Sequence, residues 1–190
     1  MEVEDLGLNG ALLIKPTIFG DDRGYFLETY RREAYREAGV ILDEVQMNRS
    51  RSSHGVLRAI HFQLSPGQPK LVSCAHGEVF NVAVDLRLHS PTFGRYAGVA
   101  LTERNGYQLY LPVGFGNGFV VISETASYNY IVGSLYDPAN EAEIAYNDPE
   151  IDIDWPVDDP NVSERDKQAP LLKDFDWSRC TWQNQPTLFS

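Results

Sequence analysis

The 190-residue sequence contains few residues that could form disulfides or bind zinc, because it has only two cysteines and four histidines. Cys74 and Cys180 are far apart and fit neither a CxxC motif nor a zinc-ligand spacing. There is also no apolar run of about 18 residues, which argues against a membrane-spanning helix. The first residues, MEVEDLGLNGALL, have no basic region before an apolar run, so no secretion signal is expected. These absences predict a cytoplasmic protein.

Basic residues are also scarce, since 27 acidic residues outnumber 16 basic ones and the formal net charge is -11. This balance disfavours binding to a nucleic-acid backbone or to an anionic membrane surface, so neither is expected as a partner. The stretch 46–70 is the exception, because it combines Arg and Lys side chains with two of the four histidines. A local cluster of this kind can still bind a small anionic ligand.

The sequence has neither a GxGxxG motif nor an alternation of strands and helices, which leaves a Rossmann fold without support. It has instead many short strand patterns separated by Gly and Pro turns, which predicts an all-β antiparallel sandwich or jelly roll. With 43% hydrophobic residues, the chain 1–190 is expected to form one globular domain with a core at about 11–136. The predicted strands are 45–50, 56–63, 70–75, 78–86, 98–101, 107–111, 118–123 and 126–133.

The two ends of the chain give weaker patterns. Residues 11–19 are apolar and interrupted by Pro16, which predicts an edge strand, and 25–30 are expected to form a second strand. The charged stretch 31–38 predicts a short surface helix that ends at Gly39. The segment 137–190 is expected to be helical or irregular, and its Trp177 and Trp182 predict that it packs against the core.

The strand 56–63 carries the most informative histidine. Strict alternation would place Val56, Arg58 and Ile60 on one face and Leu57 and His61 on the other. A single His on an apolar strand is more often structural than catalytic. The other three histidines, His54, His76 and His89, lie in turn-like contexts and are expected at the surface.

Six ordered stretches of this sequence resemble the nucleotide-sugar 3,5-epimerase family, typified by dTDP-4-dehydrorhamnose 3,5-epimerase. They are FGDDRGYFLE (19–28), QMNRSRSSHGVLRAIHFQ (46–63), KLVSCAHGEVFNVAVDLRLHSPTFGRY (70–96), LPVGFGNGF (111–119), YNYIVGSLYDP (128–138) and YNDPEIDIDWPVDDPNVSERD (146–166). The resemblance covers roughly residues 14–172. It implies a cupin-type antiparallel jelly roll with a few short peripheral helices, a homodimer, and a reaction with neither metal nor organic cofactor.

Epimerisation at a carbon next to a ketone requires a base on one face, an acid on the other, and a donor that stabilises the enolate. His61 suits the base because the pKa of histidine lies near neutrality. The resemblance implies that Asp166 fixes the tautomer of His61, that Tyr130 is the acid, and that Lys70 stabilises the developing oxyanion. The implied reaction converts dTDP-4-dehydro-6-deoxyglucose to dTDP-4-dehydro-L-rhamnose by inversion at C3 and C5.

The resemblance also implies a binding site for the nucleotide sugar. Arg58 matches a phosphate-binding arginine, for which a planar guanidinium provides bidentate geometry. The remaining implied positions surround the nucleotide, the diphosphate, the base and the sugar, and some reach across from a partner subunit. They are Arg23, Phe26 and Glu28 for nucleotide and diphosphate, Gln46 and Asn48 for the base, Tyr136 for the sugar, and Asn117 for the substrate pocket.

Several positions depart from family patterns. Metal-binding cupins use G-x5-H-x-H and a later histidine, but here Gln63 and Asn117 replace two ligands, which leaves His61 alone and argues against a metal site. The commonest epimerase pattern also has His at the position of Asn117, many members have Asp at the position of Asn81, and Gly is frequent at the position of Ala59. An Asn can donate a hydrogen bond but carries no charge at any pH.

Alternative interpretations remain open at this point. The enzyme alternatives are a monoepimerase of C3 or C5 and an epimerase of a GDP- or CDP-linked keto sugar. The non-enzymatic ones are a cupin that only binds a sugar nucleotide and a purely structural or interaction module. Residue by residue, Arg58 could be a surface charge, Lys70 a strand-start cation, Tyr130 a half-buried strand residue, and Asp166 a helix cap.

Overall fold

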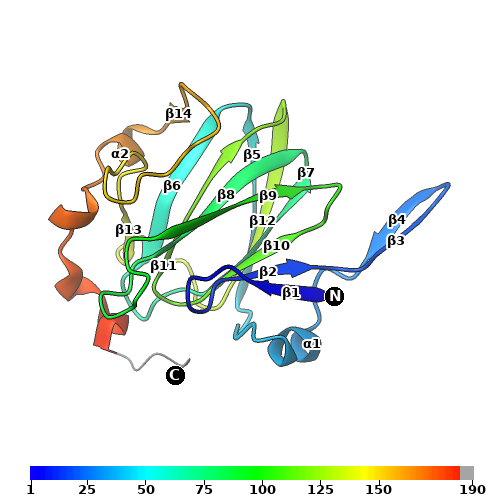
Figure 1. The fold of residues 1–190 in the computed structure, drawn as a ribbon, viewed down its shortest axis with the longest axis horizontal. Coiled ribbons are helices and arrows are strands. Elements are labelled where there is room, and N and C mark those ends of the chain that lie inside the picture. Colours follow the sequence, from blue (N-terminus) through cyan, green and yellow to red (C-terminus); the bar gives the residue numbers. More distant parts are fainter. Residues whose placement is uncertain (185–190) are drawn as a thin grey trace.

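The computed structural model describes residues 1–184, which form two facing six-stranded, mainly antiparallel sheets (Figure 1). One sheet has the order β1 (Glu2–Asp5), β2 (Leu12–Lys15), β10 (Gln108–Leu111), β7 (Lys70–His76), β12 (Thr125–Val132) and β5 (Gln46–Ser53). The other has the order β13 (Glu141–Glu143), β6 (Val56–Gln63), β11 (Phe115–Val121), β8 (Glu78–Asp85) and β9 (Tyr96–Thr102), and β14 (Asn161–Val162) pairs in parallel with β6. The predicted all-β jelly roll is confirmed.

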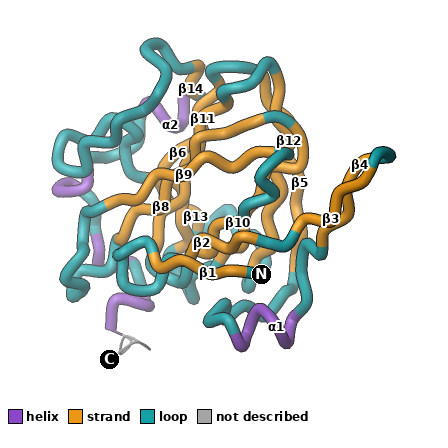
Figure 2. The backbone as a smooth tube through the Cα atoms, turned by 45° about the vertical axis from the view of Figure 1, so that its right-hand side comes forward, coloured by secondary structure: helices purple, strands orange, loops and turns teal. Residues whose placement is uncertain are grey.

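Helices are short and lie at the periphery (Figure 2). The predicted surface helix is α1 (Arg32–Glu37), and α2 (Glu164–Lys167) follows the N-cap Ser163. Three single-turn 3-10 helices span Leu172–Asp174, Trp177–Arg179 and Thr181–Asn184. No helix in the described part of the chain is long and apolar enough to cross a membrane.

The predicted central strands are confirmed with small shifts at their ends, but the N-terminal prediction needs correction. The stretch 11–19 is not one edge strand, because Pro16 ends β2 and a separate strand β3 (Ile18–Asp21) follows. The strand β2 is also not at the edge, since β1 pairs with its free side. The sequence of β1, EVED, has almost no apolar alternation and was not predicted as a strand.

The C-terminal segment packs on the second sheet, as its tryptophans predict. Trp182 is buried, and its Nε1 donates a hydrogen bond to the Gln63 carbonyl at 2.9 Å. Trp177 packs against Phe62, Phe93 and Phe175. The same segment supplies β13 and β14, which pair with β6 and were missed by the prediction of a helical or irregular structure. It therefore extends the sheet that carries His61.

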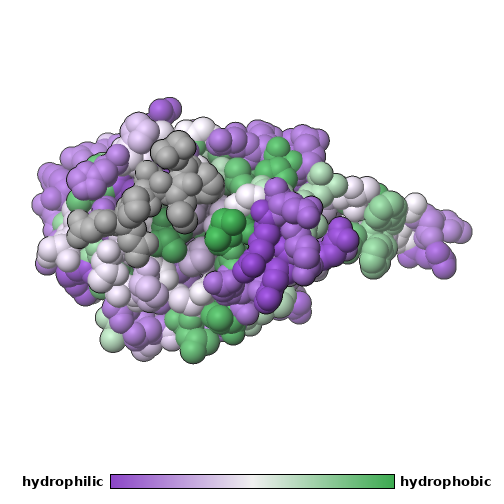
Figure 3. All heavy atoms as spheres, turned by 90° about the horizontal axis from the view of Figure 1, so that it is seen from below, coloured by the Kyte–Doolittle hydropathy of each residue, from purple (hydrophilic) through white to green (hydrophobic). Residues whose placement is uncertain are grey.

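A two-stranded ribbon, β3 paired with β4 (Gly24–Leu27), projects from the body of the molecule (Figure 1). Two of its large side chains face solvent, since Phe19 is 63% exposed and Phe26 is 69% exposed. In the space-filling view the projecting arm carries a hydrophobic patch between its base and its hydrophilic tip (Figure 3). We call these residues, 18–27, the ribbon.

Candidate active site

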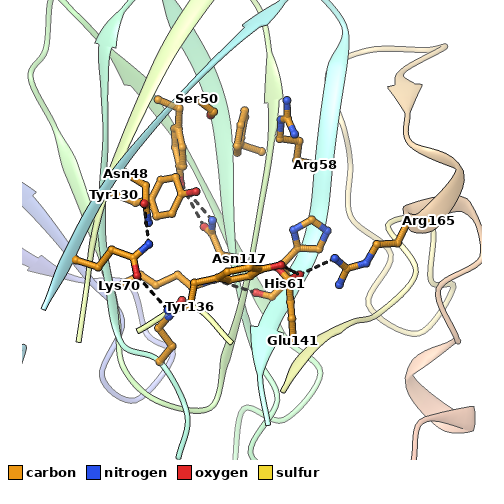
Figure 4. A pocket seen from close by; sticks show the side chains of 14 residues that line it. Asn48, Ser50, Arg58, His61, Lys70, Asn117, Tyr130, Tyr136, Glu141 and Arg165 are labelled. Carbon is orange, nitrogen blue, oxygen red and sulfur yellow. Dashed lines mark hydrogen bonds and ion pairs between the residues drawn. The ribbon is translucent and has the colours of Figure 1, made fainter. Parts of the chain in front are cut away.

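A cavity with a volume of about 400 Å³ lies between the two sheets (Figure 4). Predicted site residues that line it are Gln46, Asn48, Arg58, His61, Lys70, Asn117, Tyr130 and Tyr136. Residues that line it without having been predicted are Ser50, Gln68, Phe119, Tyr128, Glu141 and Arg165. Side chains from β5, β6, β7, β11, β12 and β13 therefore meet in one polar pocket.

The predicted pair His61 and Asp166 is formed, with His61 Nε2 and Asp166 Oδ1 separated by 2.9 Å. The helix α2 positions Asp166, whose backbone N–H donates to its N-cap Ser163 while its side chain turns to β6. Burial raises the pKa of Asp166, but its bonds with His61, Ala59 N–H and Ser163 lower it more, so the net shift is downward. Asp166 is thus both a first-turn helix residue and the ionised hydrogen-bond partner of His61 Nε2, and His61 Nδ1 takes no part in this bond.

The strand β6 does not alternate strictly, which corrects the predicted faces of Arg58 and His61. Asn117 of β11 pairs with His61, and Phe119 of β11 pairs with Arg58. A step of three residues along β6 therefore corresponds to a step of two residues along β11. A β-bulge of this kind adds one residue and changes which side chains share a face. Arg58 and His61 consequently line the same pocket, although they are three residues apart.

Lys70 begins β7 and directs its side chain into the pocket. Its Nζ lies 3.5 Å from the His61 carbonyl oxygen. Burial lowers the pKa of Lys70 to about 8, although the negative charge of Glu141 opposes the shift. The ammonium group is therefore protonated at neutral pH but close to titration.

Tyr130 lies on β12, across the pocket from β6, and is partly buried. Burial raises the pKa of its phenol, the positive charge of Arg58 lowers it, and the charge of Glu141 raises it again, with a net upward shift. The phenol therefore carries its proton at neutral pH. Its ring lies 6.0 Å from the ring of the buried Tyr128.

Four further predicted residues surround the mouth of the pocket. Arg58 is held by Ser52, whose Oγ lies 3.3 Å from the guanidinium Nη2. Gln46 and Asn48 point the same way from alternate positions of β5 and share a hydrogen bond of 2.8 Å. Gln46 also accepts a bond of 3.1 Å from the backbone N–H of Tyr136. Gln46, Asn48 and Tyr136 are thus joined by hydrogen bonds, and Arg58 is held separately by Ser52.

Three predicted substrate-binding residues lie outside this pocket. Arg23 is on the ribbon and forms an ion pair with Asp21, and Glu28, just after it, pairs with Arg31 at 3.3 Å. Phe26 is exposed on the same ribbon. A role for these residues in the site of a partner subunit stays a prediction.

Glu141 and Arg165 are the most prominent lining residues that the sequence interpretation missed. Glu141 lies on β13, and its carboxylate accepts bonds from Arg165 at 2.5 Å and from the Tyr136 hydroxyl at 3.0 Å. Burial raises the pKa of Glu141, but the bonds from Arg165 and Tyr136 lower it by more than burial raises it. The net shift is downward, so the carboxylate is ionised. The only available signal was the position of Arg165 directly before Asp166.

The two residues that replace metal ligands have other partners. The Gln63 amide donates to Ser134 Oγ and to the Leu135 carbonyl, each at 3.3 Å. Asn117 is bonded to Asn81 and Tyr128. Among residues 1–184, no three His, Cys, Asp or Glu side chains gather in a metal-binding group.

Most of the chain matches a known protein family. A family model described as dTDP-4-dehydrorhamnose 3,5-epimerase matches residues 5–174. The dTDP-4-dehydrorhamnose 3,5-epimerase of Pseudomonas aeruginosa is 46% identical over 178 residues, which is 93% of this chain and 98% of the relative. These matches confirm the resemblance that the sequence motifs indicate.

Two solved structures are similar over most of their length. RmlC of Legionella pneumophila, a dTDP-6-deoxy-D-glucose-3,5-epimerase in complex with dTDP-4-keto-L-rhamnose, superposes with a TM-score of 0.91 at 42% identity and covers 94% of this chain and 96% of its own. ChmJ of Streptomyces bikiniensis, a 3'-monoepimerase in complex with dTDP-quinovose, has a TM-score of 0.83 at 37% identity and covers 88% and 86%.

Proposed function

The chain belongs to the dTDP-4-dehydrorhamnose 3,5-epimerase family, and we propose that it inverts both C3 and C5 of dTDP-4-dehydro-6-deoxyglucose to give dTDP-4-dehydro-L-rhamnose. The chain is thus an isomerase. The observation that carries the proposal is the hydrogen-bonded pair of His61 and Asp166 in the same pocket as Lys70 and Tyr130. This set provides a base, an acid and a cation for an enolate.

The proposed first step is removal of the acidic proton next to the C4 ketone by His61. The imidazole accepts the proton, the C–H electron pair becomes the enolate, and Asp166 stabilises the resulting imidazolium. The ammonium of Lys70 stabilises the negative charge that develops on the C4 oxygen. A partly buried ammonium is suited to this task because the charge interaction is stronger where water is partly excluded.

The proposed second step returns a proton to the opposite face of the sugar. Tyr130 donates its phenolic proton to the carbanion carbon, and the ketone reforms as the configuration inverts. The positive charge of Arg58 favours the phenolate that Tyr130 becomes. The two groups return to their starting protonation states by exchange with water, and the same sequence of steps then serves the second carbon.

The nucleotide half of the proposed site uses two sets of residues. Arg58 supplies a guanidinium for a phosphate, and Gln46 and Asn48 supply amide groups for the base. Arg23, Phe26 and Glu28 are proposed to complete the site of a second copy of the chain in a homodimer, which their position on the projecting ribbon supports. Aromatic and charged groups on an arm of this kind suit a nucleobase and a diphosphate.

One alternative function has a specific observation in its favour. Similarity to the 3'-monoepimerase ChmJ at 37% identity supports a reaction at one carbon only. A related alternative is an epimerase of a GDP- or CDP-linked keto sugar.

The test of the proposed function is incubation of the purified protein with dTDP-4-dehydro-6-deoxyglucose in deuterated water. We expect deuterium at both C3 and C5. Label at one carbon would establish the monoepimerase, and absence of label at both would reject the epimerase mechanism. Titration calorimetry with dTDP, GDP, CDP and UDP identifies the nucleotide, for which we expect dTDP to bind most tightly.

A further inference from the structure

A closed ring of hydrogen bonds joins Asn81, Asn117 and Tyr128 beside the pocket. The Tyr128 hydroxyl donates to Asn81 Oδ1 at 2.5 Å, Asn81 Nδ2 donates to Asn117 Oδ1 at 3.1 Å, and Asn117 Nδ2 donates to the Tyr128 oxygen at 3.2 Å. Asn81 is fully buried, and Asn117 and Tyr128 are 9% and 2% exposed. The ring connects the two sheets, because β8 and β11 belong to one and β12 to the other.

The strand register places this ring next to the proposed base. Asn117 is paired with His61 of β6 on one side and with Ala83 of β8 on the other. Asn81 is two residues before Ala83 and therefore shares its face, so the two asparagines are diagonal neighbours. Phe119 packs its ring against the ring of Tyr128 with centroids 4.1 Å apart, which fixes the phenol beneath the pocket.

The donors and acceptors of the ring fix the orientation of each amide. Asn81 Nδ2 also donates to the Val82 carbonyl at 3.3 Å, so both of its N–H groups are used and its oxygen is left for Tyr128. Because Asn81 presents an N–H, Asn117 must turn its oxygen toward Asn81. The Asn117 nitrogen then uses one hydrogen for Tyr128 and has a second that these bonds do not use, and Asn117 itself lines the pocket.

We propose that Asn81 and Tyr128 are positioning residues that hold the Asn117 amide in the orientation that presents an N–H to the sugar. The acceptor is the carbonyl oxygen next to the carbon that His61 deprotonates, and this inference rests on the proposed function. All three side chains are uncharged, since burial raises the pKa of the Tyr128 phenol and keeps it protonated. The donor is therefore present at every pH at which the fold is intact, whereas the ammonium of Lys70 is not.

Asn81→Asp is the sharpest test because it keeps the shape of the side chain and replaces its N–H donor with an acceptor. The ionised carboxylate that this change introduces at position 81 accepts the Asn117 N–H and turns the Asn117 oxygen toward the pocket. We expect kcat to fall roughly 10²-fold at high pH, with KM nearly unchanged, because one donor to the oxyanion is lost. At low pH the carboxyl group is protonated and can donate to Asn117, so the ratio of wild-type to variant kcat must shrink as the pH falls.

Two further variants separate orientation from a general loss of structure. Tyr128→Phe keeps the ring packed on Phe119 and removes only the hydroxyl, so we expect a loss of kcat that does not vary with pH. Asn129→Asp is the matched control, because it introduces a carboxylate on the same strand as Tyr128, where Asn129 bonds to Arg49 outside the pocket. Its kcat is expected to equal that of the wild type.

A folded Asn81→Asp variant whose kcat deficit is the same at all pH values, or that raises KM alone, would overturn the proposal. A readout that needs no turnover is the NMR signal of the Asn117 side-chain amide, assigned by its loss in Asn117→Ala. Binding of the dTDP-linked keto sugar must shift this signal in the wild type and must shift it less in Asn81→Asp at high pH. Equal shifts reject the inference, whereas absence of deuterium exchange in the wild type rejects the proposed function.

Discussion

The pocket and the ribbon contain similar kinds of residues but hold them in opposite ways. In the pocket, His61 and Asp166 are hydrogen-bonded to each other. The Gln46 side chain is hydrogen-bonded to Asn48 and to the backbone N–H of Tyr136. On the ribbon, Phe26 is 69% exposed and Arg23 forms an ion pair with its neighbour Asp21. The difference supports the proposal that one chain builds the catalytic half of the site and that the ribbon contacts a second copy of the chain.

The largest effect is expected when the oriented base of the pocket is disturbed. Asp166→Asn keeps the shape of the side chain but removes the charge that fixes and stabilises His61, so we expect kcat to fall about 10²- to 10⁴-fold. The measurement is turnover of the nucleotide sugar by NMR, with dTDP binding measured in parallel.

Asp148→Asn is the matched control for this change. Asp148 is equally buried, but it accepts bonds from Glu150, Ile151 and Leu172 backbone N–H groups away from the pocket. It is expected to lower thermal stability and to leave the kcat of the folded protein near the wild-type value. An equal loss of kcat in both variants would contradict the assignment of Asp166.

The next effect is expected at Lys70, which must be protonated to stabilise an enolate. Because the pKa of Lys70 is lowered to about 8, kcat is expected to be highest below that pH and to fall as the pH rises through it. Lys70→Met removes the cation and should lower kcat about 10²- to 10³-fold while removing this alkaline limb.

Glu141→Gln sharpens the same prediction, because the charge of Glu141 opposes the lowering of the Lys70 pKa. Its removal must move the alkaline limb of the pH–kcat profile to lower pH. Glu143→Gln is the control, since Glu143 shares the Arg165 partner and lies on the same strand but does not line the pocket. If the alkaline limb of the pH–kcat profile stays at the same pH in Glu141→Gln, the limb reports a group other than Lys70.

A smaller effect, of a different kind, is expected on the ribbon. Phe26→Ser should raise KM for the nucleotide sugar and weaken self-association while leaving kcat at saturating substrate nearly unchanged. Leu88→Ser is the control, because Leu88 is 41% exposed on the body of the molecule. The readouts are sedimentation and steady-state kinetics over a range of protein concentrations. A loss of kcat in Phe26→Ser with no change in KM would contradict the proposal that the ribbon contributes to binding and the pocket to catalysis.

The smallest effect is expected at the support of Arg58. Ser52→Ala removes the hydroxyl that lies 3.3 Å from the guanidinium and leaves the rest of the pocket intact. The loss of about 1 kcal/mol for one hydrogen bond predicts a rise in KM of about fivefold and little change in kcat. An unchanged KM would mean that Ser52 does not position Arg58 for phosphate.

Local sequence pattern was sufficient for the central strands, because apolar alternation between Gly and Pro turns repeats along the chain. It failed for β1, β13 and β14, whose short polar sequences become strands only by pairing with neighbours already in place. It also failed at β6, because a bulge depends on how β11 pairs and leaves no mark in the alternation. Strand pairing in the tertiary structure, and not the local sequence, therefore determines β1, β13, β14 and the bulge in β6.

The site was predictable only in part for the same reason. His61 and Asp166 are 105 residues apart, so the sequence connects them only through the family resemblance. Glu141 and Arg165 were missed because their positions depend on β13 and α2, which lie in a segment without clear periodicity. The ring of Asn81, Asn117 and Tyr128 required three strands to be placed together before its donors and acceptors could be matched.

The central claim is that His61 removes the protons from both C3 and C5. The most direct measurement follows the dTDP-linked keto sugar by NMR in deuterated water with the wild type and with His61→Asn, while dTDP binding confirms that the pocket is intact. We predict deuterium at both carbons with the wild type and at neither with the variant. Deuterium at either carbon with His61→Asn, at a rate near that of the wild type, would contradict the account.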